Sequence, residues 1–325
     1  MSDFGTAPLS PPLGSEAGFG RLRTGIADLG RGPSRAAPDP ADTAHLVRIR
    51  DLVYQVAGIF QADSRLNFLS ERCERRMKAT GAGSLRDYYQ SLTTSTNRTQ
   101  ELHQLLNEIT IGETYFFRNE PQLSAFRQVV VPQLVHLKSR LPFVNLKIWS
   151  AGCSTGEEPY TLAMLLLEEA NASMRGHRFE IVATDLNERS LEKARVGVYD
   201  DYAVRNLPNS LRDKYLRPSN GRYEVVEAVK KKVSFSRCNL ADDARMVFMK
   251  AMDIIFCCNV LIYFEGASKR RVISHFYNDL NPGGYLYLGY SESLFGFHDD
   301  FRLVHFPGTT AYRKPETNPQ TGARE

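Results

Sequence analysis

The sequence predicts an α/β protein with a mainly parallel sheet, a small helical module before it and an antiparallel hairpin at its end. Three observations support this. Residues 127–313 alternate short apolar runs, typical of buried strands, with amphipathic segments of helical period. Residues 41–108 show helical periodicity alone. Near the end, FRLVHF (301–306) and TTAYRK (309–314) flank Pro307-Gly308, which predicts a hairpin.

The composition fits a globular protein of two modest domains, with 325 residues of which 42% are hydrophobic. A formal net charge of +4 does not favour a dedicated nucleic-acid binder. The five cysteines form no C-x-x-C pair, and an odd count argues against a disulfide framework, so we expect thiols in a reducing cytoplasm. No signal peptide or membrane span is expected, and residues 1–40 and 315–325 are predicted to be disordered tails.

The helical module (41–110) contains one strongly patterned helix over residues 64–79. Leu66, Leu69, Cys73 and Met77 fall on one face of this helix. Its flank carries a basic stripe, made of Arg65, Arg72, Arg75 and Arg76. The stripe is either a solvated helix face or a docking surface for an acidic helical partner. LRDYYQSL (85–92) and ELHQLLNEI (101–109) predict two further helices.

The chain is organised around LKIWSAGCSTGEE (146–158), a strand that ends in small residues and leads into a helix. Such a turn exposes backbone to a ligand at the carboxyl end of a strand. The next strand, FEIVATD, ends in Asp185, which is placed to accept hydrogen bonds from ribose hydroxyls. These two strands therefore predict a cofactor that contains a nucleoside.

Two acids at the start of the helix, Glu157 and Glu158, indicate which cofactor this is. They disfavour a pyrophosphate, and Cys153 and Ser154 interrupt a G-x-G-x-x-G pattern. The acids either simply complement the helix dipole or suit a ligand with a cationic end. The second possibility favours S-adenosylmethionine over NAD.

The remaining elements follow in the order of an open α/β sheet. Strands are expected at 146–150, 180–185, 233–237, 252–257 and 284–289, and helices near 121–139, 157–171, 188–196 and 265–279. Residues 200–232 interrupt the alternation and predict a small antiparallel insert. A parallel sheet with a terminal antiparallel hairpin is typical of the Rossmann-like class I methyltransferases.

Polar residues stand at three strand ends: Asp185, Asn239 and Asn259, with Tyr263 four residues after the last. Each alone is an ordinary end of a strand, but together they predict one site. Arg118 follows the aromatic run Tyr115–Phe117 and is either a stacked or a carboxylate-binding group.

Five segments carry a resemblance to a known family. They are GETYFFR (112–118), WSAGCSTGEEPYTLAM (149–164), ATDLNERSLEKARVGVY (183–199), FCCNVLIYF (256–264) and GGYLYLGYSESL (283–294). Together with the helical module they resemble the CheR-type chemotaxis receptor methyltransferases over residues 43–314. That family transfers a methyl group from S-adenosylmethionine to receptor glutamates and forms glutamate methyl esters.

The resemblance implies roles for particular residues. Cofactor contacts would fall on Thr114, Arg118, Glu158, Asp185, Asn239, Leu240, Asn259 and Val260. The reaction centre would lie near Arg118 and Tyr263, in a methyltransferase domain of residues 111–314. The basic helix would face the acidic, helical methylation region of a receptor, and the enzyme would act as a cytoplasmic monomer without a metal.

The chain departs from the family pattern in the insert and at Gly112, Cys153 and Cys257–Cys258. Gly112 stands where the family often has Asn, and Cys258 where it commonly has Arg before the Asn of the fourth strand. The insert is short, which favours an enzyme that needs no tethering peptide. The alternatives are an NAD-dependent oxidoreductase, a nucleic-acid methyltransferase and a non-catalytic receptor-binding adaptor. The missing third glycine of a G-x-G-x-x-G pattern argues against the oxidoreductase, and the low net charge argues against the nucleic-acid methyltransferase. The presence of Arg118, Asp185, Asn259 and Tyr263 argues against the adaptor.

Overall fold

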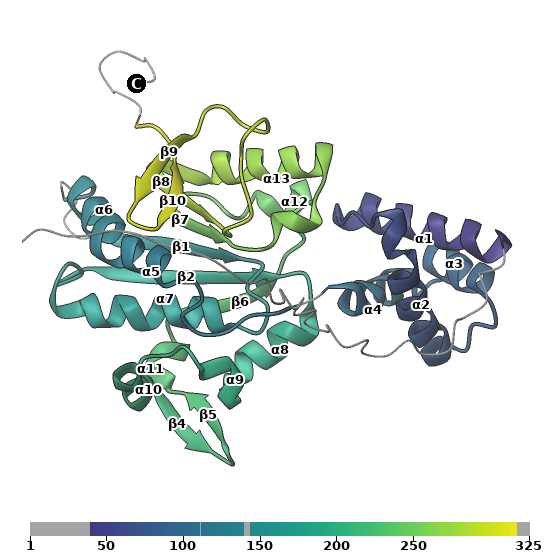
Figure 1. The fold of residues 1–325 in the computed structure, drawn as a ribbon, viewed down its shortest axis with the longest axis horizontal. Helices are drawn as coiled ribbons and strands as arrows, with labels where there is room; N and C mark the ends of the chain where they lie inside the picture. Colours follow the sequence, from purple (N-terminus) through teal and green to yellow (C-terminus); the bar gives the residue numbers. More distant parts are fainter. Residues whose placement is uncertain (1–39, 111, 140–143, 317–325) are drawn as a thin grey trace, which may run out of the picture. The chain divides into compact units, whose positions relative to one another are not determined.

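The computed structural model describes residues 40–110, 112–139 and 144–316 (Figure 1). The tails expected at 1–40 and 315–325 lie outside these residues, except for Pro40 and positions 315–316. Among the described helices none is long and apolar enough to cross a membrane.

The N-terminal module is all-helical, as the sequence predicts. It consists of α1 (Pro40–Ala57), a 3₁₀ turn η1 (Asp63–Arg65), α2 (Leu66–Thr80), α3 (Leu85–Thr94) and α4 (Arg98–Ile109). The expected apolar face of α2 packs inward, with Leu69 and Cys73 fully buried. Helix α2 ends at Gly81, whose φ of 76° is the left-handed conformation that glycine adopts without a steric cost. The module therefore has a core of its own, built from all four helices.

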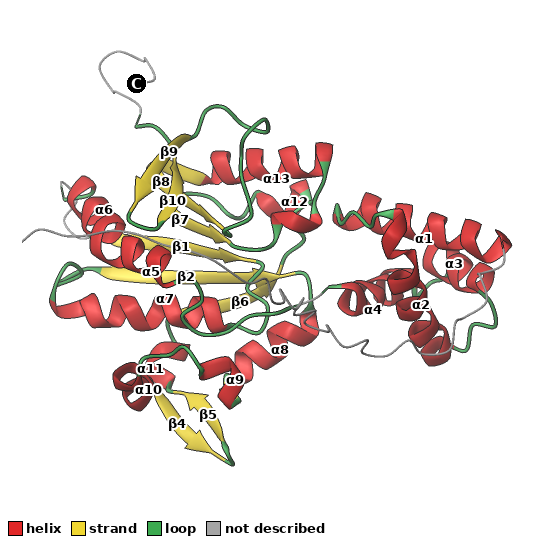
Figure 2. Ribbon diagram, in the orientation of Figure 1, coloured by secondary structure: helices red, strands yellow, loops and turns green. Residues whose placement is uncertain are grey.

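The second part of the chain is built on a seven-stranded sheet of order β6-β2-β1-β7-β8-β10-β9 (Figure 2). Its strands are β1 (Asn145–Ala151), β2 (Arg178–Asp185), β6 (Val233–Arg237), β7 (Met252–Cys257), β8 (Leu280–Leu288), β9 (Arg302–Phe306) and β10 (Thr309–Arg313). The first five are parallel, and β10 pairs antiparallel with both β8 and β9. The predicted parallel sheet with a terminal antiparallel hairpin is confirmed.

Helices cover both faces of this sheet. They are α5 (Glu120–Ala125), the π-helical η2 (Phe126–Val130), α6 (Val131–Leu137), α7 (Glu157–Glu168), η3 (Glu169–Asn171), α8 (Glu188–Val196), α12 (Asp243–Met246) and α13 (Gly266–Asp279). Successive β1 side chains point to opposite faces. Ile148 joins the core under η2, α6 and α7, whereas Trp149 packs edge-on against Phe276 of α13, with ring centroids 5.3 Å apart. Burying each such side chain contributes roughly 1.5–3 kcal/mol.

The insert forms a separate three-stranded antiparallel sheet, β3-β5-β4. It comprises β3 (Val198–Tyr199), α9 (Asp201–Val204), α10 (Asn209–Tyr215), β4 (Leu216–Ser219), β5 (Arg222–Val225) and α11 (Glu227–Lys230). The sequence predicted the antiparallel pairing but not the three short helices. It also placed one helix at 121–139, where the structure has two α-helices joined by a π turn.

Strand order reverses next to β1, because the chain passes from β1 to β2 and β6 and then returns to place β7 on the other side. At such a switch point the carboxyl ends of neighbouring strands diverge and leave a crevice, where open α/β sheets bind ligands. The loop after β1 and the turn after β7 both open here.

Candidate functional site

A cavity of about 550 Å³ lies at this switch point. Its walls come from the ends of β1, β2 and β7, from residues 112–119 before α5, from Ala57 at the end of α1 and from Ile59 just after it. All eight residues predicted as cofactor contacts line it, and so does Tyr263. The structure thus brings together side chains that span 150 positions of sequence.

Backbone hydrogen bonds to β2 fix the conformation of the glycine loop after β1. Gly152 (φ 80°) and Cys153 both donate their N–H to the carbonyl oxygen of Thr184 on β2, at 2.7 and 2.9 Å. A side chain at Gly152 would lie 2.4 Å from Cγ2 of Val260, so the close approach of the loop to the turn after β7 requires glycine. The hydroxyl of Ser154 is buried and has no hydrogen-bond partner.

Asp185 ends β2 and faces the glycine loop. Its Oδ2 accepts from the backbone N–H of Ser154 and its Oδ1 from that of Asn187, both at 2.8 Å. Burial raises the pKa of Asp185, and the backbone donors oppose that shift. A carboxylate has about four acceptor sites, and backbone N–H groups of Asn187, Ser154 and Leu186 use three of them, so Asp185 organises the loop and can still accept from a ligand hydroxyl.

Glu158 lies in the first turn of α7, and its carboxyl faces the cavity. Its Oε1 accepts from the Ser150 hydroxyl at 2.7 Å. Burial raises the pKa of Glu158 to about 7, while Ser150 and Cys258 hydrogen bonds and the positive charge of Arg118 act to lower it. This carboxyl is therefore poised to ionise when a cation enters the cavity.

The two strand-end asparagines have different surroundings. Asn259 has a φ of 62° and donates its backbone N–H to Oε2 of Glu292 at 2.8 Å. Asn239 donates from its amide to the carbonyl oxygen of Val56 at 2.6 Å and accepts from the N–H of Ala241. Asn239 therefore also fastens the end of α1 to the cavity rim.

Arg118 and Tyr263 are the residues predicted for the reaction centre. Arg118 donates to the carbonyl oxygen of Glu113 at 2.8 Å and lies beside the Tyr115 ring, with Cζ 5.6 Å from its centroid. None of the ion pairs among the described residues includes Arg118. Tyr263 ends the 3₁₀ turn η4 (Leu261–Tyr263); burial raises its pKa, and the charges of Arg65 and Arg118 oppose the shift. Arg118 thus acts electrostatically on both Glu158 and Tyr263.

Sequence reasoning missed Glu292. Its carboxylate accepts three backbone N–H groups, from Asn259 (2.8 Å), Gly289 (2.6 Å) and Ile262 (3.2 Å). It therefore ties the turn that carries Tyr263 to the loop after β8. A lone Glu in SESL, 30 and 33 residues from Ile262 and Asn259, gives no signal in the sequence for these contacts.

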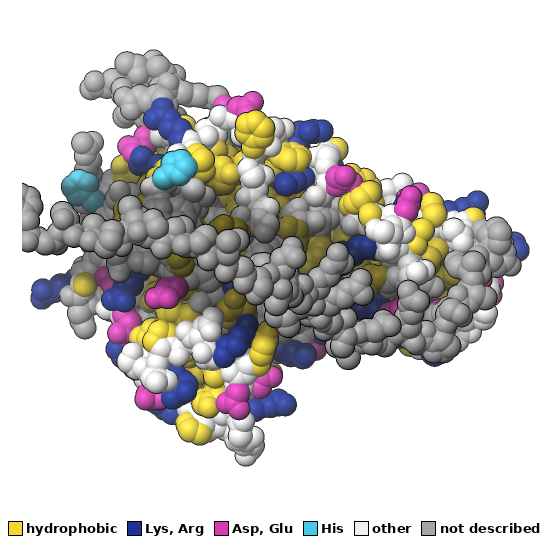
Figure 3. All heavy atoms as spheres, viewed as in Figure 1, with side chains coloured by type: hydrophobic (Ala, Val, Ile, Leu, Met, Phe, Trp, Pro, Cys, Tyr) yellow, Lys and Arg dark blue, Asp and Glu magenta, His cyan; other side chains and the backbone are white. Residues whose placement is uncertain are grey.

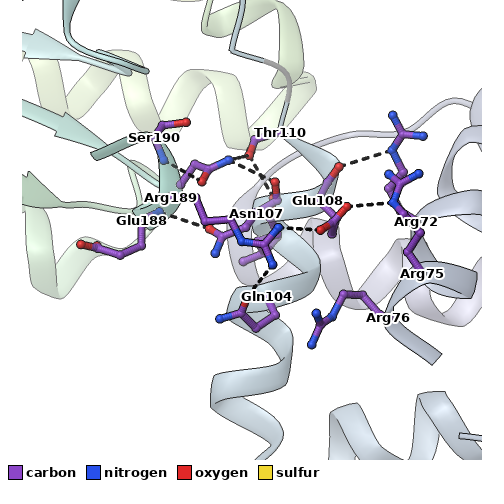
Figure 4. Close-up of polar contacts among 12 residues, drawn as sticks. Arg72, Arg75, Arg76, Gln104, Asn107, Glu108, Thr110, Glu188, Arg189 and Ser190 are labelled. Carbon is purple, nitrogen blue, oxygen red and sulfur yellow. Dashed lines mark hydrogen bonds and ion pairs between the residues drawn. The ribbon is translucent and has the colours of Figure 1, made fainter. Parts of the chain in front are cut away.

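The basic stripe of α2 is partly used inside the protein. Arg76 donates twice to the carboxylate of Glu101, at 2.9 and 2.7 Å, and its side chain is only 13% exposed. In Figure 4, Glu108 of α4 lies between Arg75 on α2 and Arg189 on α8, and accepts from them at 3.0 and 2.7 Å. The docking role stays a prediction for all four arginines, but Arg72, Arg75 and Arg76 already have carboxylate partners, with Arg72 paired to Glu71 at 3.1 Å.

The residues fit S-adenosylmethionine. The cavity offers a carboxylate for a positive group (Glu158), a carboxylate at a strand end for ribose hydroxyls (Asp185) and an unpartnered buried hydroxyl (Ser154). Gly112 borders the same corner, because a side chain there would displace the Ser154 hydroxyl, 2.3 Å away. Among the described residues no cluster of three or more His, Cys, Asp or Glu could hold a metal ion; the expected lack of a metal stays a prediction.

The fold and the site define a class I S-adenosylmethionine methyltransferase with an N-terminal helical domain. The family model described as "CheR methyltransferase, SAM binding domain" matches residues 112–309, and "CheR methyltransferase, all-alpha domain" matches residues 44–110. The chain belongs to the CheR methyltransferase family. It is 37% identical to chemotaxis protein methyltransferase 2 of Vibrio cholerae (82% of this chain, 92% of that protein).

Two further relatives also match over most of both chains. The chain is 34% identical to the chemotaxis protein methyltransferase of Borreliella burgdorferi, over 77% of this chain and 88% of that protein. It is 32% identical to chemotaxis protein methyltransferase 1 of Pseudomonas aeruginosa, over 84% and 98% respectively. The resemblance drawn from the sequence motifs is thereby confirmed.

Proposed function

We propose that the protein methylates glutamate side chains of methyl-accepting chemotaxis receptors with S-adenosylmethionine, in the cytoplasm, and forms glutamate methyl esters. The observation that carries the proposal is one cavity in which Glu158 and Asp185 suit the cofactor, while Arg118 and Tyr263 line the same cavity and interact electrostatically. The relatives are named chemotaxis protein methyltransferases, which supports the biological setting.

The chemistry demands little of the protein beyond alignment. When bound, S-adenosylmethionine supplies a methyl group already activated by its sulfonium. A glutamate carboxylate, with an ordinary pKa of about 4.3, is ionised at neutral pH and needs no general base. Arg118 attracts and orients this carboxylate, and the hydroxyl of Tyr263 donates a further hydrogen bond to it. Both groups limit its motion, which makes the displacement effectively unimolecular.

The helical domain (41–110) supplies the receptor contact in this proposal. Its basic stripe faces an acidic helical partner mainly through Arg65 and through Arg75, whose side chain is 49% exposed. Arg72 and Arg76 are less exposed, at 20% and 13%, and pair with Glu71 and Glu101. Arg72 stacks on Phe68, with Cζ 3.8 Å from the ring centroid, which holds its guanidinium in place.

The test uses the cytoplasmic fragment of a methyl-accepting receptor encoded in the same genome. The enzyme is incubated with this fragment and radiolabelled S-adenosylmethionine. We expect base-labile label on glutamates, which is diagnostic of a methyl ester. Arg118→Ala should lower the rate at least a hundredfold, by more than any loss of affinity for S-adenosylhomocysteine accounts for, whereas Arg212→Ala on α10 should change neither. Base-stable label would contradict the ester chemistry, and receptor binding without label would instead support the adaptor.

A further inference from the structure

Arg205, which follows α9 in the insert, is held between two aromatic rings. Its Cζ lies 3.6 Å from the centroid of Tyr115 and 3.7 Å from that of Tyr202. It also donates to the carbonyl oxygen of Tyr202. Ordering an arginine side chain on binding costs free energy because rotamer entropy is lost, but here stacking has already fixed the plane of the guanidinium. The guanidinium is therefore preorganised although its side chain is exposed.

This arginine adjoins the reaction centre. Tyr115 lines the cavity. The Cζ atoms of Arg205 and Arg118 lie 3.6 Å and 5.6 Å from the centroid of its ring, so both guanidinium groups contact the same aromatic side chain. A backbone hydrogen bond fixes the distance between the segment that contains Tyr115 and the insert that contains Arg205, because Phe116 donates its N–H to the carbonyl oxygen of Ala203 in α9 at 2.9 Å. The side chain of Phe116 is fully buried and packs edge-on against Tyr199. The segment before α5 and the insert thus form one rigid rim.

The hydrogen-bonding capacity of Arg205 is largely unused. None of the ion pairs among residues 40–110, 112–139 and 144–316 includes it, although Asp200 and Asp201 lie close in sequence. Glu113 belongs to the same rim, where its Oε1 accepts from the Tyr202 hydroxyl at 3.4 Å. A planar, weakly hydrated guanidinium with free N–H groups matches a carboxylate, which it binds through two parallel hydrogen bonds.

From this geometry we infer that Arg205 binds a second carboxylate of the substrate helix, three or four residues from the glutamate that is methylated. The inference rests on the proposed function. On a helix, side chains at i, i+3 and i+4 share a face about one turn apart, so two guanidinium groups that both lie near the Tyr115 ring can each meet one of them. Arg118 would receive the acceptor glutamate and Arg205 its acidic neighbour. Arg205 is then a specificity-determining residue, and acceptor sites with an acidic neighbour are methylated faster.

The experiment uses the full-length enzyme and the same receptor cytoplasmic fragment, with one acceptor glutamate mapped by mass spectrometry and the other acceptors changed to alanine. The four positions three and four residues on either side are set to Glu or Gln in turn. We expect one position at which Glu gives a kcat/KM about five- to tenfold above Gln for the wild-type enzyme. In Arg205→Gln this ratio should fall to about one, while the rate on the Gln fragment is retained.

Controls separate recognition from structure. Arg212→Gln removes an equally charged residue of the same insert, 3.5 Å from Asp213, and should keep the wild-type ratio. Arg205→Lys should keep part of it, because the charge remains and the planar stack is lost. Affinity for S-adenosylhomocysteine should be unchanged in every variant.

Two results would overturn the inference while leaving the proposed function intact. One is an unchanged Glu-to-Gln ratio in Arg205→Gln. The other is an equal loss of rate on both fragments, which marks a structural role only. No base-labile ester on any fragment with the wild-type enzyme would overturn the proposed function, and this inference with it.

Discussion

Cofactor binding should depend on pH through Glu158. In the free protein, burial raises the pKa of this carboxyl to about 7, so about half of the molecules carry it ionised at neutral pH. A cationic ligand favours the ionised form. Below the pKa, binding must first remove a proton, and the apparent affinity then falls by up to tenfold per pH unit. Above the pKa the carboxylate is already present, and the affinity levels off.

The expected change between pH 8 and pH 6 is therefore about tenfold weaker binding at the lower pH. Calorimetry at both pH values, in buffers of different ionisation enthalpy, measures the affinity and the proton released. Glu158→Gln should bind more weakly at pH 8 and lose this pH dependence. Asp185 and Glu157 also have raised pKa values, and this variant keeps both. The reasoning is refuted if the wild-type affinity is flat over this range, or if Glu158→Gln keeps the same slope.

Three further outcomes follow from contacts in the structure. Asp185→Ala should weaken S-adenosylhomocysteine binding at least tenfold by calorimetry, because ribose acceptors and the anchor of the glycine loop are lost together; unchanged affinity would rule out that role. Glu292→Gln should lower the rate of ester formation about tenfold, since it leaves backbone donors around the Tyr263 turn unmatched; a wild-type rate would count against this anchor. Arg76→Ala should lower the free energy of unfolding in urea by roughly 2–3 kcal/mol, because the mostly buried Glu101 loses its charged partner and keeps only the Tyr88 hydroxyl, whereas Lys78→Ala on the same helix should change it by less than about 0.5 kcal/mol.

Parts of the site could be predicted because they depend on local sequence. The strand–glycine–helix segment at 146–158 and the acid that ends β2 are short-range patterns whose geometry is largely dictated by the sheet they belong to. In a parallel sheet all carboxyl strand ends meet at one edge, so Asp185 and Asn259 had to lie near each other once the strands were assigned. Arg118 and Tyr263 lie outside the strands, and only the family resemblance linked them before the structure was known.

Other features depend on contacts that no local pattern encodes. Arg75 and Arg76 look like their neighbours Arg65 and Arg72 on a helical projection, yet Glu101 and Glu108 reach them from α4. Whether a charge on a helix face is solvated or paired depends on which element packs beside it, and that is a long-range property. The same holds for Arg205, whose stacking between Tyr115 and Tyr202 joins two segments almost ninety residues apart.

The sequence by itself determined the class of fold, the family and the strand-end residues of the cofactor site, because hydrophobic period and strand order constrain these strongly. Only the tertiary structure decided which charges remain available to a partner, that Glu158 has a pKa near 7, and that Glu292 and Arg205 belong to the working rim of the cavity. Ionisation and ion pairing depend on burial and on neighbours within a few ångströms, and those neighbours come from distant parts of the chain.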